Sequence, residues 1–85
     1  MQSKEEIKKV VRKLFCGVIE MDPADLNDDK SFLDMAVDSM AAVEFIRLLR
    51  AEFGEKMTMT AIELYEHSTI NKVTDHLFNL VSKNG

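Results

Sequence analysis

Residues 39–53 read SMAAVEFIRLLRAEF, and this stretch predicts the central helix of the fold. Its apolar side chains recur every three or four residues, which places them along one side of an α-helix. The apolar positions are Val43, Phe45, Ile46, Leu48, Leu49 and Phe53. Either Asp38 or Ser39 can cap the start, because each has a side-chain oxygen that accepts a backbone N–H. Gly54 follows the stretch and is the residue type that commonly ends a helix.

A first helix is predicted before this one, over about residues 3–19. Its apolar residues also follow helical spacing. They are Ile7, Val10, Val11, Leu14, Phe15, Val18 and Ile19. Ser3 and Glu6 stand three residues apart, as in a capping box at a helix start. The single cysteine, Cys16, lies beside the apolar stripe, and we expect it to be a small, partly buried hydrophobic residue.

Residues 22–38 predict a long connection between these two helices. Asp22 followed by Pro23 is typical of a short helical turn. A connection of this length needs apolar residues that hold it against the core. We expect Phe32 and Leu33 to be these anchors.

Two more helices are predicted after Gly54. Thr60 and Glu63 form a second capping-box pattern, which opens a short helix ending at about residue 66. Ser68 or Thr69 can cap a last helix. Its expected core face consists of Ile70, Val73, Leu77, Leu80 and Val81, with Phe78 beside it. The sequence therefore predicts an all-α domain over residues 1–85, a bundle of three longer helices and one short third helix with a long first loop.

Composition and charge exclude several classes of function. The net charge is −4, and residues 20–38 hold seven acidic residues and one lysine, so this segment repels the phosphates of nucleic acids. No apolar run is long enough to span a bilayer, and one cysteine cannot form an internal disulfide. Because the sequence opens at Met1 without a signal-like segment, we expect a free-standing, cytoplasmic monomer.

Metal binding is also not expected. Counted from Asp25, the acidic loop resembles a calcium-binding loop, but Lys30 stands where glycine is needed and Ala36 where a bidentate glutamate is needed. His67 and His76 lack a third ligand at a useful spacing, and we interpret both as surface or helix-end residues. The sequence offers no set of catalytic residues either.

The stretch FLDMAVDSM at residues 32–40 allows two interpretations. In the simpler one, Asp38 or Ser39 only caps the second helix. However, the stretch resembles the attachment signature of the acyl carrier protein and peptidyl carrier family, in which Asp-Ser-Leu follows a phenylalanine and a leucine-glycine pair. Here Met40 stands for the leucine, and Glu44 matches a position that is commonly acidic.

A second segment supports this resemblance. LYEHSTI at residues 64–70 resembles the Leu-Phe-Glu-His-Pro-Thr-Ile of many polyketide and nonribosomal carrier domains, with Ser68 in place of proline. Two positions depart from the family. Ala36 replaces the usual glycine, so the local turn is expected to differ, and Arg47 and Arg50 neutralise a helix that is acidic in fatty-acid carriers.

The resemblance implies a carrier and not an enzyme. A separate phosphopantetheinyl transferase would attach 4′-phosphopantetheine to Ser39, and Asp38 would help to hold the transferase's metal ion. The thiol of this group would carry acyl intermediates as thioesters to an acyltransferase, ketosynthase or other biosynthetic enzyme. Met40, Glu44 and Arg47 share one helix face next to Ser39 and are the predicted partner-binding residues.

Three assignments remain open at this point. The style of residues 64–70 favours polyketide or mixed polyketide–nonribosomal peptide biosynthesis. A fatty-acid or aminoacyl carrier is the alternative within the family. The alternative from another class is a small helical interaction protein without a prosthetic group.

Overall fold

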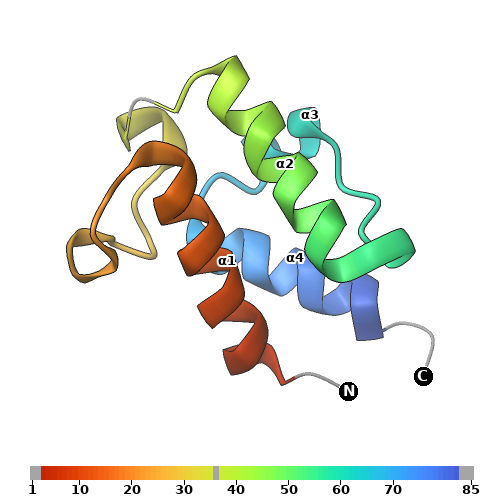
Figure 1. Ribbon diagram of the computed structural model, residues 1–85. Helices are drawn as coiled ribbons and strands as arrows, with labels where there is room; N and C mark the ends of the chain where they lie inside the picture. Colours follow the sequence, from red (N-terminus) through yellow and green to blue (C-terminus); the bar gives the residue numbers. More distant parts are fainter. Residues whose placement is uncertain (1–2, 36, 83–85) are drawn as a thin grey trace.

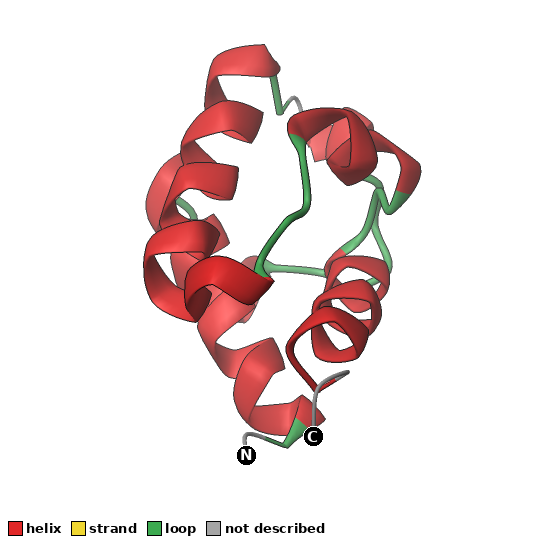
Figure 2. Ribbon diagram, turned by 90° about the vertical axis from the view of Figure 1, so that its right-hand side faces the viewer, coloured by secondary structure: helices red, strands yellow, loops and turns green. Residues whose placement is uncertain are grey.

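The computed structural model describes residues 3–35 and 37–82 of the chain, and helices form most of this part (Figures 1 and 2). The described residues contain four α-helices and three short 3-10 helices, and none of them is in a strand. The α-helices are α1 (Lys4–Ile19), α2 (Ser39–Phe53), α3 (Ala61–Glu66) and α4 (Ile70–Ser82). The 3-10 helices are η1 (Pro23–Asp25), η2 (Phe32–Met35) and η3 (Gly54–Lys56). The predicted all-α architecture with one short third helix is confirmed.

Helix α1 packs against both α2 and α4, and α2 also contacts α3 and η3 (Figure 1). The centre of this arrangement is a cluster of three phenylalanine rings from three elements, Phe15 of α1, Phe32 of η2 and Phe45 of α2. The ring centroids of Phe15 lie 4.9 Å from Phe32 and 5.3 Å from Phe45, and those of Phe32 and Phe45 lie 6.3 Å apart. Such tilted and edge-to-face contacts are favourable beyond the burial of the rings.

The ends of α1 and α2 follow the sequence-based prediction. The Ser3 hydroxyl accepts the N–H of Glu6, and the Glu6 carboxylate accepts the N–H of Ser3, so the capping box forms. Helix α2 spans the predicted range and stops at Gly54, whose φ of 78° suits glycine. Cys16 is buried, as its place beside the stripe of α1 suggested.

The long first connection is fastened to the helices through its acidic residues. Asp28 pairs with Lys8 and Arg12 of α1, and the Arg12 guanidinium also donates to the carbonyl of Pro23 at 2.6 Å. Asn71 of α4 donates its backbone N–H to the carbonyl of Asp28 and its side-chain amide to Asp29. Part of the negative charge of this segment is thus neutralised inside the molecule by basic residues of α1.

Phe32 and Leu33 do not both anchor this connection. Phe32 is fully buried, whereas Leu33 is 68% exposed, so the prediction is wrong for Leu33. The two residues are consecutive in η2, and successive side chains of a 3-10 helix point about 120° apart. Only one of them can therefore face the core. The backbone supports the same choice, because the N–H of Phe32 donates to the carbonyl of Ser68 at 2.8 Å.

The second half of the chain confirms the predicted helices but not every predicted cap. Thr60 caps α3 through its hydroxyl, which accepts the N–H of Glu63. The Glu63 carboxylate does not complete a capping box, because it lies 3.2 Å from Nε2 of His76. Thr69 caps α4 by accepting the N–H of Lys72. In the predicted core face of α4, Ile70, Val73 and Leu77 are buried and Leu80 and Val81 are half-buried.

The length and composition of the helices also decide whether one of them could cross a membrane. No helix in the described part of the chain combines the length and the apolar character that crossing a membrane requires.

Candidate functional site

Ser39 is the first residue of α2, and its side chain is exposed to solvent. Asp38 directly before it has extended backbone, and its carboxylate oxygen Oδ1 accepts the N–H of Ala41 at 2.8 Å. The carbonyl of Asp38 accepts the N–H of Ala42 at 3.0 Å. Asp38 is therefore the capping residue, and α2 does not need the Ser39 hydroxyl for this purpose.

The start of α2 is a favourable place for a negatively charged substituent. The first turn of an α-helix has backbone N–H groups without partners inside the helix, and the aligned peptide dipoles add a partial positive charge. Helix α2 has 15 residues, so this effect is fully developed at its first turn. A phosphate ester on Ser39 would be stabilised there.

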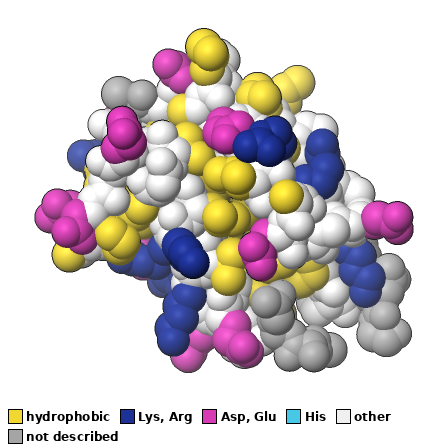
Figure 3. Space-filling view, in the orientation of Figure 1, with side chains coloured by type: hydrophobic (Ala, Val, Ile, Leu, Met, Phe, Trp, Pro, Cys, Tyr) yellow, Lys and Arg dark blue, Asp and Glu magenta, His cyan; other side chains and the backbone are white. Residues whose placement is uncertain are grey.

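Apolar side chains surround Ser39 on the surface. An open hollow of about 560 Å³ is lined by Ser39, Met40, Val43 and Glu44. Met40 is 81% exposed and Val43 is 58% exposed. In the space-filling view, hydrophobic side chains gather toward the top, where α2 begins (Figure 3). The molecule thus presents an apolar surface beside an exposed hydroxyl.

The prediction placed Val43 on the core stripe of α2, and this is wrong. Val43 and Phe45 are two residues apart, which separates their directions on a helix by about 200°. Phe45 is fully buried, so Val43 points outward. Sequence reasoning also missed the exposed apolar Ile62 of α3. Its place next to the Thr60 cap, on a helix of only six residues, was the available signal, because so short a helix buries only one side.

Glu44 and Arg47 form a two-fold hydrogen-bonded ion pair on the outer face of α2. Nε of Arg47 lies 2.8 Å from Oε1 of Glu44, and Nη2 lies 2.7 Å from Oε2. The guanidinium of Arg47 lowers the pKa of Glu44, and the carboxylate of Glu44 raises the pKa of Arg47. Both side chains are exposed, so water and salt screen the pair and a partner protein can reach it.

Three of the five predicted site residues line one hollow, and the other two make hydrogen bonds to residues of α2. Ser39, Met40 and Glu44 line the same hollow, Asp38 accepts the N–H of Ala41 in the first turn of α2, and Arg47 is bound to Glu44. Ala36, where the turn was expected to differ, lies outside the described residues. Where side chains are described, no three His, Cys, Asp or Glu residues are arranged to hold a metal ion.

The histidines are nearer to each other than the sequence suggested. His67 ends α3 and His76 lies on α4, and their rings stack with centroids 4.2 Å apart. Both are half-buried. The Glu63 carboxylate of α3 lies 3.2 Å from Nε2 of His76, so the two histidines and Glu63 connect the end of α3 to α4.

Comparison with known proteins gives consistent matches. Residues 9–77 match the family model described as "Phosphopantetheine attachment site". The chain is 26% identical over 73 residues to the polyketide synthase PksL of Bacillus subtilis (strain 168), which covers 86% of this chain and 2% of PksL. It is 26% and 27% identical over 66 residues to the orsellinic acid synthases of Armillaria mellea and Armillaria ostoyae, covering 78% of this chain and 3% of each synthase.

The chain thus spans only a few per cent of the length of these relatives. Among solved structures, the NMR structure of the HMG-ACPI domain of the CurA module from Lyngbya majuscula is similar, with a TM-score of 0.81. The match covers 98% of this chain and 83% of that chain at 20% sequence identity, so it shows a shared fold.

Proposed function

This chain belongs to the phosphopantetheine attachment-site family, and from this premise we propose that its 4′-phosphopantetheine is attached to the hydroxyl of Ser39. The family consists of carriers that bind this group covalently, and not of enzymes. The observation that supports Ser39 is its position. It is an exposed hydroxyl at the first residue of α2, and Asp38 already serves as the cap.

The residues around Ser39 fit the group. The exposed side chain leaves room for an enzyme to approach, and the first turn of α2 favours the negative charge of a phosphodiester. The hollow next to Ser39 is mostly apolar, and its rim carries the exposed Met40 and Val43. The apolar rim suits the carbon chain of the group.

Ser39 and Asp38 have separate roles in the attachment of the group. When bound, the group supplies a terminal thiol that holds acyl intermediates as thioesters. Asp38 fixes the first turn of α2 through its bond to Ala41, which fixes the position of the Ser39 oxygen. Only Oδ1 of Asp38 is used in this bond, so Oδ2 is available to a metal ion of the phosphopantetheinyl transferase.

We further propose that Met40, Glu44 and Arg47 form the surface that partner enzymes recognise. Met40 offers an exposed apolar contact beside the attachment residue. The exposed pair of Glu44 and Arg47 supplies both signs of charge, which determines partner choice and the rate of encounter more than the final affinity. Biosynthetic enzymes such as an acyltransferase or a ketosynthase, together with the transferase, are the expected partners.

The proposed pathway is polyketide or mixed polyketide–nonribosomal peptide biosynthesis. Its support is that the relatives found in three organisms are named as polyketide or orsellinic acid synthases. The segment at residues 64–70 supports the same style of carrier, and in the structure it spans the end of α3 and the start of α4.

Intact mass spectrometry after co-expression with a broad-specificity phosphopantetheinyl transferase tests the attachment. The wild-type chain should gain the mass of one phosphopantetheine group, and Ser39→Ala should gain none. Ser31→Ala is the matched control, because Ser31 lies in the same connection and its hydroxyl accepts the N–H of Leu33. Modification of Ser39→Ala, or loss of modification in Ser31→Ala alone, would refute the assignment.

A further inference from the structure

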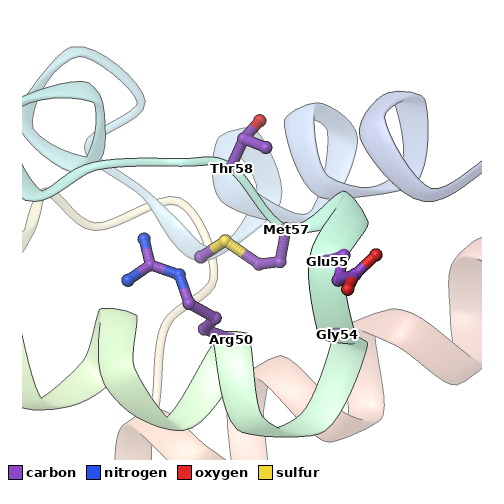
Figure 4. A pocket seen from close by; sticks show the side chains of 5 residues that line it. All are labelled: Arg50, Gly54, Glu55, Met57 and Thr58. Atoms are coloured by element: carbon purple, nitrogen blue, oxygen red, sulfur yellow. The ribbon is translucent and has the colours of Figure 1, made fainter.

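A second open hollow lies at the other end of α2 from Ser39. It has a volume of about 550 Å³ and is lined by Arg50, Gly54, Glu55, Met57 and Thr58. The Arg50 guanidinium and the Met57 thioether lie beside each other, between α2 and the segment that follows η3 (Figure 4). Met57 is almost fully buried, so it forms an apolar floor beside the charged group. A cationic group and an apolar group therefore face the same space.

The guanidinium of Arg50 has hydrogen-bond donors left for an acidic group. Within the part of the chain that the structure describes, its side chain makes one hydrogen bond, from Nη2 to the carbonyl of Met59 at 3.5 Å, and no ion pair. Its neighbour Arg47 is instead bound to Glu44 by hydrogen bonds of 2.8 Å and 2.7 Å. Because Glu44 and Arg47 together carry no net charge, Arg50 is the cation of α2 that has no acidic partner among the described residues.

The acidic residues closest to Arg50 in the sequence direct their charge elsewhere. Glu55 lines the hollow, but its carboxylate points to the side away from Arg50 (Figure 4). Glu52 comes two residues after Arg50 in α2, which separates their directions around the helix by about 200°. A carboxylate that approaches from another molecule therefore meets open donors, and a guanidinium can bind both oxygens of such a group at once.

We propose that this hollow is a docking site for an acidic side chain of a partner protein, with an apolar side chain next to it. The carboxylate binds the guanidinium of Arg50, and the apolar side chain covers Met57. Arginine is among the residues that contribute most to protein interfaces, because it combines charge, hydrogen bonds and an apolar stem. The site goes beyond the proposed attachment, since Arg50 is eleven residues after Ser39 and roughly 16 Å away along the axis of α2.

The charges at the two ends of α2 fix the orientation of such a partner. Asp38 is an exposed acidic residue at the start of the helix, and Arg50 is an exposed basic residue near its end. A partner that places an acidic group on Arg50 and a basic group near Asp38 fits in one direction only. Complementary charges of this kind select the partner and its orientation more than they raise the affinity.

A nuclear magnetic resonance titration of the full chain with short blocked peptides tests this inference. The probe is acetyl-Glu-Ala-Leu-amide, whose first and third side chains share one face when its backbone is extended. Two matched peptides each lack one group: acetyl-Gln-Ala-Leu-amide lacks the charge, and acetyl-Glu-Ala-Ser-amide lacks the large apolar side chain. We expect the probe to shift the side-chain Nε–H of Arg50 and the amides of residues 54–58, and each matched peptide to bind about threefold more weakly.

Three variants and added salt show whether the probe occupies this hollow. Arg50→Gln should remove the preference for the charged probe, whereas Arg47→Gln should keep it, because Arg47 is bound to Glu44. Ser39→Ala should bind the probe as the wild-type chain does, since Ser39 is not part of this hollow. Because Arg50 is exposed, 0.5 M salt should weaken the binding, as charges are then screened beyond about 4 Å.

Three results would overturn the inference. They are equal shifts with the probe and with acetyl-Gln-Ala-Leu-amide, a preference for the charged probe that survives in Arg50→Gln, and shifts of residues 54–58 when the chain alone is diluted. The last result would assign the hollow to a second copy of the chain. None of them affects the attachment at Ser39, which intact mass tests separately, so each proposal can fail while the other stands.

Discussion

Replacement of Phe32 by alanine should remove a large part of the stability of this domain. The ring is fully buried against Phe15 and Phe45, with centroids 4.9 Å and 6.3 Å away. Truncation of such a phenylalanine to alanine costs about 3–5 kcal/mol. A domain of this size has a free energy of unfolding of about 4–13 kcal/mol, at about 0.05–0.15 kcal/mol per residue. The loss is therefore a large fraction of the stability, at least about a quarter of it even at the upper end of this range.

Urea unfolding followed by circular dichroism measures this loss. With a slope of about 1.5 kcal/mol per molar urea, the midpoint of Phe32→Ala should fall by about 2–3 M. Leu33→Ala is the matched control, because Leu33 is the next residue of η2 and its side chain is mostly exposed. It should change the free energy of unfolding by no more than about 0.5 kcal/mol. A loss below about 1 kcal/mol in Phe32→Ala, or equal losses in both variants, would refute the reasoning.

Four other predictions, which concern the two glycines, Asp38, Arg47 and Glu6, have definite expected outcomes. Gly54→Ala should lower the free energy of unfolding by about 1–3 kcal/mol, because the backbone of Gly54 has φ 78° and ψ −155°, which strains an alanine. Gly17→Ala inside α1 should instead raise it by about 0.5–1 kcal/mol, since nothing lies within 4 Å of the new atom. Urea unfolding of both variants separates backbone strain from packing. Asp38→Ala should lose the cap of α2 and lower the thermal midpoint by about 4–8 °C, whereas Asp38→Ser should keep most of it, as measured by thermal circular dichroism. Arg47→Glu should slow acyl transfer to the natural partner about tenfold at low salt and less at high salt, and unchanged transfer rates would contradict a role in recognition. The backbone N–H of Ser3 donates to the carboxylate of Glu6, and this hydrogen bond lowers the pKa of Glu6 below 4.5. The stabilising effect of the ionised Glu6 is therefore present above pH 4.5 and is lost as the pH falls through the lowered pKa. Glu6→Gln should flatten the decrease of stability between about pH 5 and about pH 3, and equal slopes in the two proteins would count against this.

The helices could be predicted because their signals are local. The start and end of α2 depend on Asp38, on the apolar spacing and on the glycine that follows, all of which lie within the segment itself. The capping box of Ser3 and Glu6 also needs only four consecutive residues. The exposed position of Ser39 at a helix start follows from the same information.

The errors arose where a residue depends on a distant part of the chain. Which of Phe32 and Leu33 enters the core is decided by the rings of Phe15 and Phe45 and by the carbonyl of Ser68. Glu63 stands at the position of a capping-box glutamate, but its carboxylate contacts His76 of another helix. These contacts join residues far apart in the sequence, so periodicity and capping patterns do not contain them.

The surface around Ser39 was likewise only partly predictable. Met40, Glu44 and Arg47 follow from helical spacing once Ser39 is placed at the start of α2. The exposure of Val43 depends on the rotation of α2 that buries Phe45 and Ile46. The hollow at Arg50 depends on how the chain turns back after Gly54, which helical spacing does not describe.

The position of the added group among the five serines of the chain tests the central claim most directly. Wild-type protein that has been modified by a phosphopantetheinyl transferase is digested, and the fragments are sequenced by tandem mass spectrometry. The account predicts that the phosphopantetheine mass is found on Ser39 alone. The group on Ser3, Ser31, Ser68 or Ser82, or a chain that stays unmodified, would contradict it.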